Sequence, residues 1–158
     1  MAELDRKLAA AIDHTLLRPE ADGREVARAR VIYGDTDQMG MVYYANYLRY
    51  FEIARNEYLR VVGQTYRAFE ESHGLMLPVV EAHVSYHKPA RYDDELVISA
   101  ATFARGAASV RFEYEIHRGA DGERLVSGHT IHACVTRDGR VVRLPAEMRA
   151  AVGLGEKA

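Results

Sequence analysis

Two carboxylates, Asp35 and Asp37, are the side chains of this sequence that are best placed to do chemistry. They stand two residues apart in a loop bounded by Gly34 and Gly40, between a short apolar run and a long segment that is free of Gly and Pro. A helix that begins after such a loop offers free N–H groups and the positive end of its dipole. An aspartate there can act as general base or nucleophile, while the helix start stabilises a developing negative charge. The same spacing also fits an Asx-type turn with solvated carboxylates.

Other reactive side chains fit structural roles better. His83 and His87 lie in a β-type pattern, which separates them by about 13 Å and prevents them from sharing a metal ion. His129 and His132 point to opposite faces of a predicted strand. Cys134 lies in a strand pattern, which favours the role of a small core residue over that of a nucleophile. The sequence contains no P-loop, dinucleotide fingerprint or Gly-x-Ser-x-Gly elbow. We therefore predict no metal site and no cofactor.

Composition limits the function classes further. The chain has 158 residues, 48% hydrophobic and 28% charged, which is typical of one globular domain with a small extension. A formal net charge of −2 disfavours a nucleic-acid partner, and no apolar run approaches the ~20 residues that membrane insertion needs. A single cysteine excludes an internal disulfide, and the mixed-charge start does not resemble a signal peptide. We expect a cytoplasmic protein.

The first half of the chain contains the helical elements that would position the loop. A short strand is expected at residues 29–33, before the two aspartates. Apolar residues recur at three and four over residues 46–62, on more than one side, which predicts a mostly buried helix. Asn46 is expected to cap this helix and Gly63 to end it. Residues 65–72 predict a second, short helix.

From residue 77 the hydrophobic period changes to two, which is typical of strands. Strands are expected at residues 80–86, 96–103, 108–117, 125–136 and 141–144. The short connections between them, two of which are Asp-Gly turns, require antiparallel neighbours. The resulting sheet must bury one face, and the helix over 46–62 is the large apolar element available to cover it. The predicted fold is α+β, an antiparallel sheet curled around one central helix.

The loop and the start of the helix carry a specific resemblance. Residues 33–52, YGDTDQMGMVYYANYLRYFE, closely resemble the signature of the 4-hydroxybenzoyl-CoA thioesterase family, above all its Tol–Pal-associated branch of short acyl-CoA thioesterases. Residues 88–96, KPARYDDEL, and 144–147, LPAE, resemble later parts of that family. The resemblance covers roughly residues 29–150. It implies the hotdog fold, a long helix wrapped by an antiparallel sheet, and hydrolysis of an acyl-CoA thioester.

The resemblance also implies roles for individual residues. Asp37 would be the catalytic carboxylate, either as nucleophile or as a base that activates water, and the backbone N–H of Tyr44 would polarise the thioester carbonyl. Several relatives carry His at the position of Tyr44. Some relatives also carry a basic run between the third and fourth strands that holds the CoA phosphates, whereas residues 105–108 of this chain contain one cation, Arg105. The residues expected to contact the acyl-CoA substrate are Gly40, Tyr43, Tyr47, Lys88, Arg91 and Arg105.

Hotdog proteins place their site at a dimer interface and often form tetramers. The resemblance therefore implies a homo-oligomer, with a dimer of dimers as the expected form.

Two alternatives to a thioesterase stay open on the sequence. One is a hotdog module that binds an acyl-CoA or acyl carrier without turning it over. The other is a magnesium-dependent phosphatase of the haloacid dehalogenase type, in which Asp35 and Asp37 would form the nucleophile loop and Asp93 and Asp94 would bind the metal. That phosphatase fold needs a parallel sheet with alternating helices, which the period-two runs contradict.

The expected domain organisation has three parts. Residues 1–28 form an N-terminal helical extension and linker, 29–152 the thioesterase domain, and 153–158 a C-terminal tail. Residues 11–21 resemble the opening of deoxyribose-phosphate aldolases, but the remaining chain is too short for the ~250-residue barrel of those enzymes. We interpret this segment as an extra helix without aldolase activity.

Overall fold

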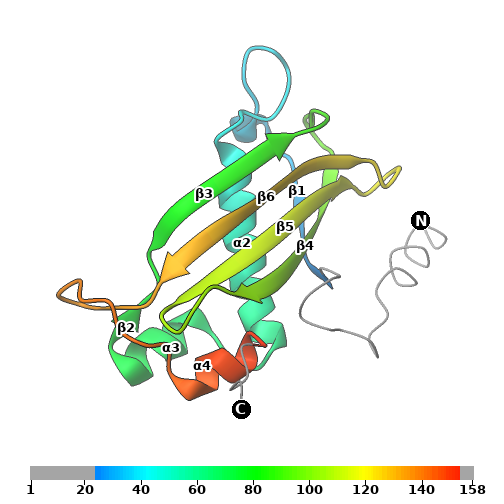
Figure 1. Ribbon diagram of the computed structural model, residues 1–158. Helices are drawn as coiled ribbons and strands as arrows, with labels where there is room; N and C mark the ends of the chain where they lie inside the picture. Colours follow the sequence, from blue (N-terminus) through cyan, green and yellow to red (C-terminus); the bar gives the residue numbers. More distant parts are fainter. Residues whose placement is uncertain (1–23, 154–158) are drawn as a thin grey trace.

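Five antiparallel strands curl around helix α2 (Asn46–Val61) in the computed structural model, which describes residues 24–153 (Figure 1). The strands are β1 (Arg24–Arg30), β3 (Val79–Tyr86), β4 (Glu95–Ala104), β5 (Ser109–Arg118) and β6 (Arg124–Ala133), in the order β1-β4-β5-β6-β3. The smaller elements are a 3₁₀ turn (Tyr33–Asp35), α3 (Tyr66–His73), β2 (Leu75–Met76), β7 (Val135–Thr136) and α4 (Ala146–Ala151). The α+β architecture expected from the sequence is confirmed. Within residues 24–153, no helix is both long and apolar enough to cross a bilayer.

Strand β1 begins earlier than the sequence pattern indicated. It pairs antiparallel with β4 from Arg24 to Arg30, whereas the apolar run predicted a strand at 29–33. Two arginines of this charged strand pair with carboxylates: Arg28 lies 2.7 Å from both Glu25 and Glu95, and Arg30 lies 3.5 Å from Glu95. Part of the expected extension is therefore a strand of the main sheet. The expected helix in the first 23 residues and the last five residues of the chain lie outside the described residues.

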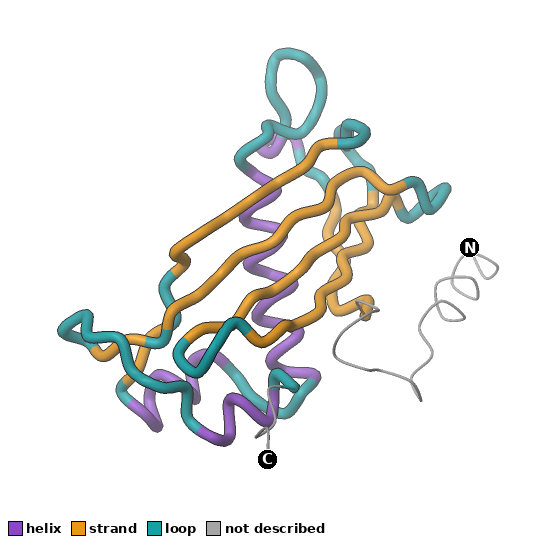
Figure 2. Tube along the Cα trace, viewed as in Figure 1, coloured by secondary structure: helices purple, strands orange, loops and turns teal. Residues whose placement is uncertain are grey.

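Helix α2 matches the predicted span and fills the concave side of the sheet (Figure 2). Gly63, with φ +86°, follows its end as expected. The prediction that Asn46 caps the helix is wrong: Ala45 occupies the cap position, and the Asn46 side chain donates instead to the carbonyl of Asp35, at 2.9 Å. Helix α3 is confirmed; its cap Thr65 accepts a hydrogen bond from the N–H of Ala68. The buried residues of α2 are Tyr47, Tyr50, Phe51, Ala54, Tyr58 and Leu59.

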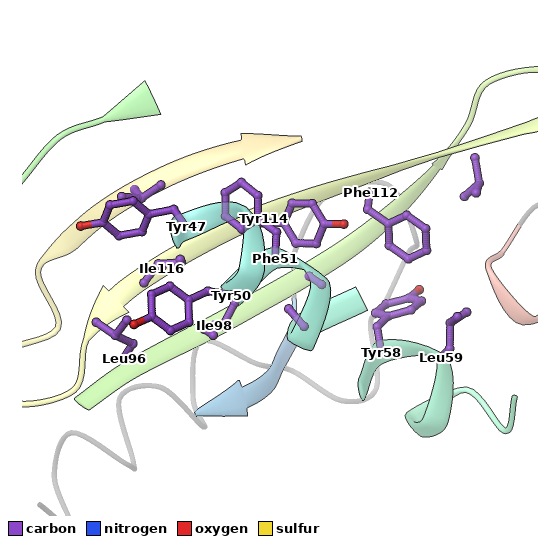
Figure 3. Packing of buried hydrophobic residues seen from close by; sticks show 14 of the residues in the cluster. Tyr47, Tyr50, Phe51, Tyr58, Leu59, Leu96, Ile98, Phe112, Tyr114 and Ile116 are labelled. Atoms are coloured by element: carbon purple, nitrogen blue, oxygen red, sulfur yellow. The ribbon is translucent and has the colours of Figure 1, made fainter. Parts of the chain in front are cut away.

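The helix lies close against the sheet because of one glycine. Phe51 of α2 stacks on Tyr114 of β5 with ring centroids 4.3 Å apart (Figure 3). A Cβ atom at Gly128 of β6 would lie 2.3 Å from the carbonyl oxygen of His83 and 2.8 Å from the ring of Phe51. A side chain at this position would therefore force the helix, β3 or both away from β6. The alternation predicted for β5 is confirmed, with Phe112, Tyr114 and Ile116 buried.

The last two predicted strands differ from the observed chain. The run 125–136 divides into β6 and β7 at Cys134, which is buried as expected. The expected strand at 141–144 is wrong, because only Val141 forms a bridge, to Val135, before the chain turns toward α4. The reason is that β7 leaves the main sheet to pair with β2, so residues 141–144 have no strand of that sheet beside them. The turn at Gly139, with φ +87°, is as expected.

Candidate active site

Asp35 is the buried member of the aspartate pair. Its side chain accepts a hydrogen bond from the Tyr50 hydroxyl at 2.7 Å and from the Ile32 N–H at 3.3 Å, and Arg49 lies 3.3 Å away. Burial, followed by the hydrogen bond to Asp35, raises the pKa of Tyr50, so this phenol stays a donor at neutral pH. The carboxylate of Asp35 thus has a structural role on the inner side of the loop.

The backbone of Asp35 ties the loop to the start of α2. Its carbonyl oxygen accepts hydrogen bonds from the N–H of Tyr43 and from the side chain of Asn46, both at 2.9 Å. Val42, between the loop and the helix, donates to the carbonyl of Ala90 at 2.9 Å. The loop is therefore held both by the helix that follows it and by the connection between β3 and β4.

Asp37 closes a tight turn and keeps one carboxylate oxygen available. Its Oδ1 accepts from the N–H of Met39 at 2.8 Å, its N–H donates to Met41, and its carbonyl accepts from Gly40 at 3.0 Å. Gly40 has φ +75°, a conformation that favours glycine. Among residues 24–153, no donor is bonded to the Oδ2 of Asp37. The Asx-type turn and a chemical role therefore coexist, because the turn uses only one of the two oxygens.

A pocket of about 260 Å³ opens beside this carboxylate. Four of the residues expected at the site line it together: Asp37, Tyr44, Tyr47 and Lys88. The pocket also contains residues that sequence reasoning missed, which are Met39, Met41, Val42, Tyr86, His87 and Pro89. The period-two pattern of β3 was the available signal for Tyr86, since it places this ring on the face of the sheet that covers the helix.

The start of α2 supplies hydrogen-bond donors to the same region. The N–H of Asn46 donates to the Tyr43 carbonyl at 2.9 Å, which orients the peptide group that carries the Tyr44 N–H. Within the described part of the chain, neither the Tyr44 N–H nor the Ala45 N–H donates to an acceptor. Free N–H groups at a helix start are suited to stabilise negative charge that develops on a carbonyl oxygen.

The other expected substrate contacts lie at different distances from the pocket. Tyr43 is exposed and packs on Tyr44 with ring centroids 4.7 Å apart, outside the pocket lining. Arg91 donates to the carbonyl of Gly40 at 3.1 Å, so its guanidinium braces the loop. Arg105 follows β4 at the end of the strand that lies away from the loop. The ten residues of β4 span about 30 Å, so Arg105 is remote from the pocket of its own chain.

The histidines and the second aspartate pair are engaged elsewhere. The rings of His83 and His129 stack 5.5 Å apart, whereas His132 is buried and hydrogen-bonds the Leu77 carbonyl at 2.8 Å, so His129 and His132 face opposite sides as expected. Asp94 accepts from the N–H of Arg91 at 2.9 Å within a turn. In the described range 24–153, no group of three or more His, Cys, Asp or Glu side chains could hold a metal ion.

Comparisons with known proteins point to one family. The profile of the thioesterase-like superfamily matches residues 31–152. The putative acyl-CoA thioesterase YneP of Bacillus subtilis is 33% identical over 68% of this chain and 77% of its own length. The acyl-CoA thioesterase YbgC of Haemophilus influenzae is 33% identical over 77% of this chain and 89% of its own.

A solved structure supports the same conclusion. An aspartate-to-asparagine mutant of 4-hydroxybenzoyl-CoA thioesterase, in complex with 4-hydroxybenzoyl-CoA, superposes with a TM-score of 0.72 at 25% identity and covers 80% of this chain and 96% of the other. The hotdog fold implied by the resemblance is confirmed. The phosphatase alternative is wrong at the level of the fold, because the sheet is antiparallel.

Proposed function

Because the chain belongs to the thioesterase-like superfamily, we propose that it hydrolyses the thioester bond of an acyl-CoA to the free acid and CoA. The observation that carries this proposal is the meeting, at one pocket, of the Asp37 carboxylate and Tyr44, whose backbone N–H is free among the described residues. A base or nucleophile opposite an oxyanion site is the arrangement that acyl transfer to water requires.

Asp37 can act by two routes. As a general base it takes a proton from water, the oxygen of that water attacks the thioester carbonyl, and the carbon–sulfur bond breaks to release the CoA thiolate. As a nucleophile it forms an acyl–aspartyl anhydride and expels the thiolate, and water then hydrolyses the anhydride. In both routes the carbonyl oxygen becomes negative, and the N–H of Tyr44 stabilises it. The related mutant that was solved with 4-hydroxybenzoyl-CoA carries asparagine in place of one aspartate.

The pocket walls suit the two ends of such a substrate. Tyr47 is buried in the wall with its hydroxyl 3.3 Å from the N–H of Ala90, so its ring offers an apolar surface to an acyl group. Lys88 lies at the pocket and is exposed, which suits a phosphate of CoA. We assign Arg91 to the same basic rim, next to the carbonyl that it braces. Gly40 and Tyr43 border the substrate through the loop and the start of the helix.

We further propose that the active unit is a homodimer joined along β3, within a dimer of dimers. Strand β3 is an edge of the sheet, and its apolar Val79 and Val80 are about half exposed. An exposed edge strand is a template for pairing with another chain. Antiparallel pairing of two β3 edges sets the Val79 end of one copy beside the Tyr86 end, and hence the pocket, of the other.

This dimer would give Arg105 a role. Arg105 follows the end of β4, and the strand register places that end of the sheet in line with the start of β3: Ala104 pairs with Val110, which pairs with His132, which pairs with Val79. In the antiparallel dimer, Arg105 of the partner subunit would reach the end of the joined sheet that holds the pocket. We place this enzyme in the cytoplasm, because a lone buried cysteine fits a reducing compartment.

Turnover of an acyl-CoA panel tests the proposal. The full chain is incubated with short-chain, long-chain and 4-hydroxybenzoyl thioesters of CoA, and the released thiol is followed with a chromogenic thiol reagent. We expect saturable release of free CoA from at least one thioester. Tight binding measured by calorimetry without release of thiol would instead identify a binding module and would overturn the proposal.

A further inference from the structure

Tyr86 links the end of β3 to the start of α2. Its hydroxyl donates a hydrogen bond to the backbone carbonyl of Tyr44 at 3.0 Å. Its ring packs edge-on against Tyr47, with centroids 5.6 Å apart, and against Tyr44, with centroids 6.5 Å apart. All three tyrosines line the pocket that contains Asp37. A side chain of the sheet therefore holds the backbone of the helix start in place.

The carbonyl that Tyr86 holds belongs to the same peptide group as the Ala45 N–H. A peptide group is planar and trans, so an anchored C=O sets the direction of the N–H on the opposite side. The preceding peptide group, which carries the Tyr44 N–H, is anchored independently by the 2.9 Å bond from Asn46 to the Tyr43 carbonyl. Two successive N–H groups are thus oriented, one by the helix itself and one by Tyr86.

We propose that Tyr86 is a positioning residue for thioester hydrolysis: by holding the Tyr44 carbonyl it fixes the helix start at Tyr44, the residue that lines the pocket and whose N–H donates to the oxyanion. This inference rests on the proposed function.

The protonation state of Tyr86 suits this role. Desolvation by its surroundings, with a smaller contribution from Tyr44, raises the pKa of Tyr86 above its ordinary value. The phenol therefore keeps its proton at neutral pH and can donate to the carbonyl throughout the working range of such an enzyme.

The variant Tyr86→Phe removes only the hydroxyl and tests the inference. We expect kcat for acyl-CoA hydrolysis to fall about 10-fold, because one oriented oxyanion donor is lost in part. KM should change less than twofold, and the melting midpoint and oligomeric state should stay those of the parent protein. The control is Tyr66→Phe, which removes a hydroxyl that accepts a hydrogen bond from the Leu77 N–H at 3.1 Å, outside the Asp37 pocket. Its kcat should equal that of the parent.

Each other result overturns the inference. An unchanged kcat in Tyr86→Phe would show that the peptide needs no alignment, and a raised KM with unchanged kcat would show that the hydroxyl binds substrate directly. If Tyr86→Phe lowers the melting midpoint or changes the oligomeric state, and Tyr66→Phe loses as much kcat, then the hydroxyl of Tyr86 has a merely structural role. If the parent protein hydrolyses no thioester of the panel, it is the proposed function that fails.

Discussion

Substitution of each aspartate of the loop by asparagine separates chemistry from architecture. Asp37→Asn removes the negative charge but leaves an Oδ1 that can still accept from the Met39 N–H, the one hydrogen bond to that side chain among the described residues. We expect kcat to fall 100-fold or more, which corresponds to about 2.7 kcal/mol of transition-state stabilisation. KM should change little, and the free energy of unfolding should stay within about 0.5 kcal/mol of the parent value.

Asp35→Asn should instead lower the stability of the fold more than it lowers kcat. The substitution replaces a buried charged acceptor of the Tyr50 hydroxyl and the Ile32 N–H with a neutral amide. Hydrogen bonds to charged groups contribute about 1.5–3 kcal/mol, and the contribution of Arg49 is small because its side chain is 70% exposed. We expect the free energy of unfolding to fall by about 2 kcal/mol and the melting midpoint by about 6 °C. The backbone bonds of Asp35 are retained, so kcat should fall less than tenfold below the melting range.

The two variants are compared by steady-state thiol release at 25 °C and by thermal unfolding of the same preparations. The reasoning is refuted if Asp37→Asn keeps kcat within threefold of the parent. It is equally refuted if Asp35→Asn loses more kcat than Asp37→Asn while its melting midpoint is unchanged, because Asp35 would then be the reactive carboxylate.

Four further predictions address other parts of the molecule. Gly128→Ala should lower the free energy of unfolding by about 3 kcal/mol in a urea titration, since its Cβ would collide with the His83 carbonyl; an unchanged midpoint would contradict the close packing. Burial lowers the pKa of His132 to about 4 from 6.5, so its contribution to stability should be nearly complete at pH 7.5 and above and should fall by about 2 kcal/mol on going to pH 5, a loss that should largely disappear in His132→Gln. Val80→Lys should shift the dimer to monomer in analytical ultracentrifugation, because a charge on the β3 edge opposes pairing. Treatment with a chelator followed by desalting should leave thioester hydrolysis intact; activity that returns only with added Zn²⁺ or Mg²⁺ would refute a metal-free mechanism.

Local patterns predict most of this fold, and long-range pairing accounts for what they miss. The helix over 46–62 and the alternating run of β5 are visible in the sequence because each buries one face, and burial imposes a period. Strand β1 shows no such period, and two of its arginines, Arg28 and Arg30, pair with Glu95 on β4, a partner far away in the sequence. Asn46 appeared to be a helix cap because only the folded loop brings the Asp35 carbonyl within reach of its side chain.

The candidate site likewise contains residues that a local sequence motif reveals and residues that only the folded chain brings to the pocket. Asp37, Tyr44 and Gly40 lie in one continuous motif, so their roles follow from a resemblance over 20 residues. Tyr86 and His87 enter the pocket from the end of β3; the period-two pattern of β3 assigns Tyr86 to the helix-facing side of the sheet, but only the folded sheet brings that end of the strand to the loop. Arg105 is an exposed cation in a turn, and only the pairing of two β3 edges would give it a place near the chemistry.

The start of α2 is held from three directions that the chain supplies separately. The loop contributes the carbonyl of Asp35, the β3–β4 connection contributes that of Ala90, and β3 contributes the hydroxyl of Tyr86. A group that stabilises an oxyanion is effective only if it need not reorganise during the reaction, which requires such independent anchors. Because β3 is also the proposed dimer edge, assembly and the alignment of the N–H donors depend on one strand.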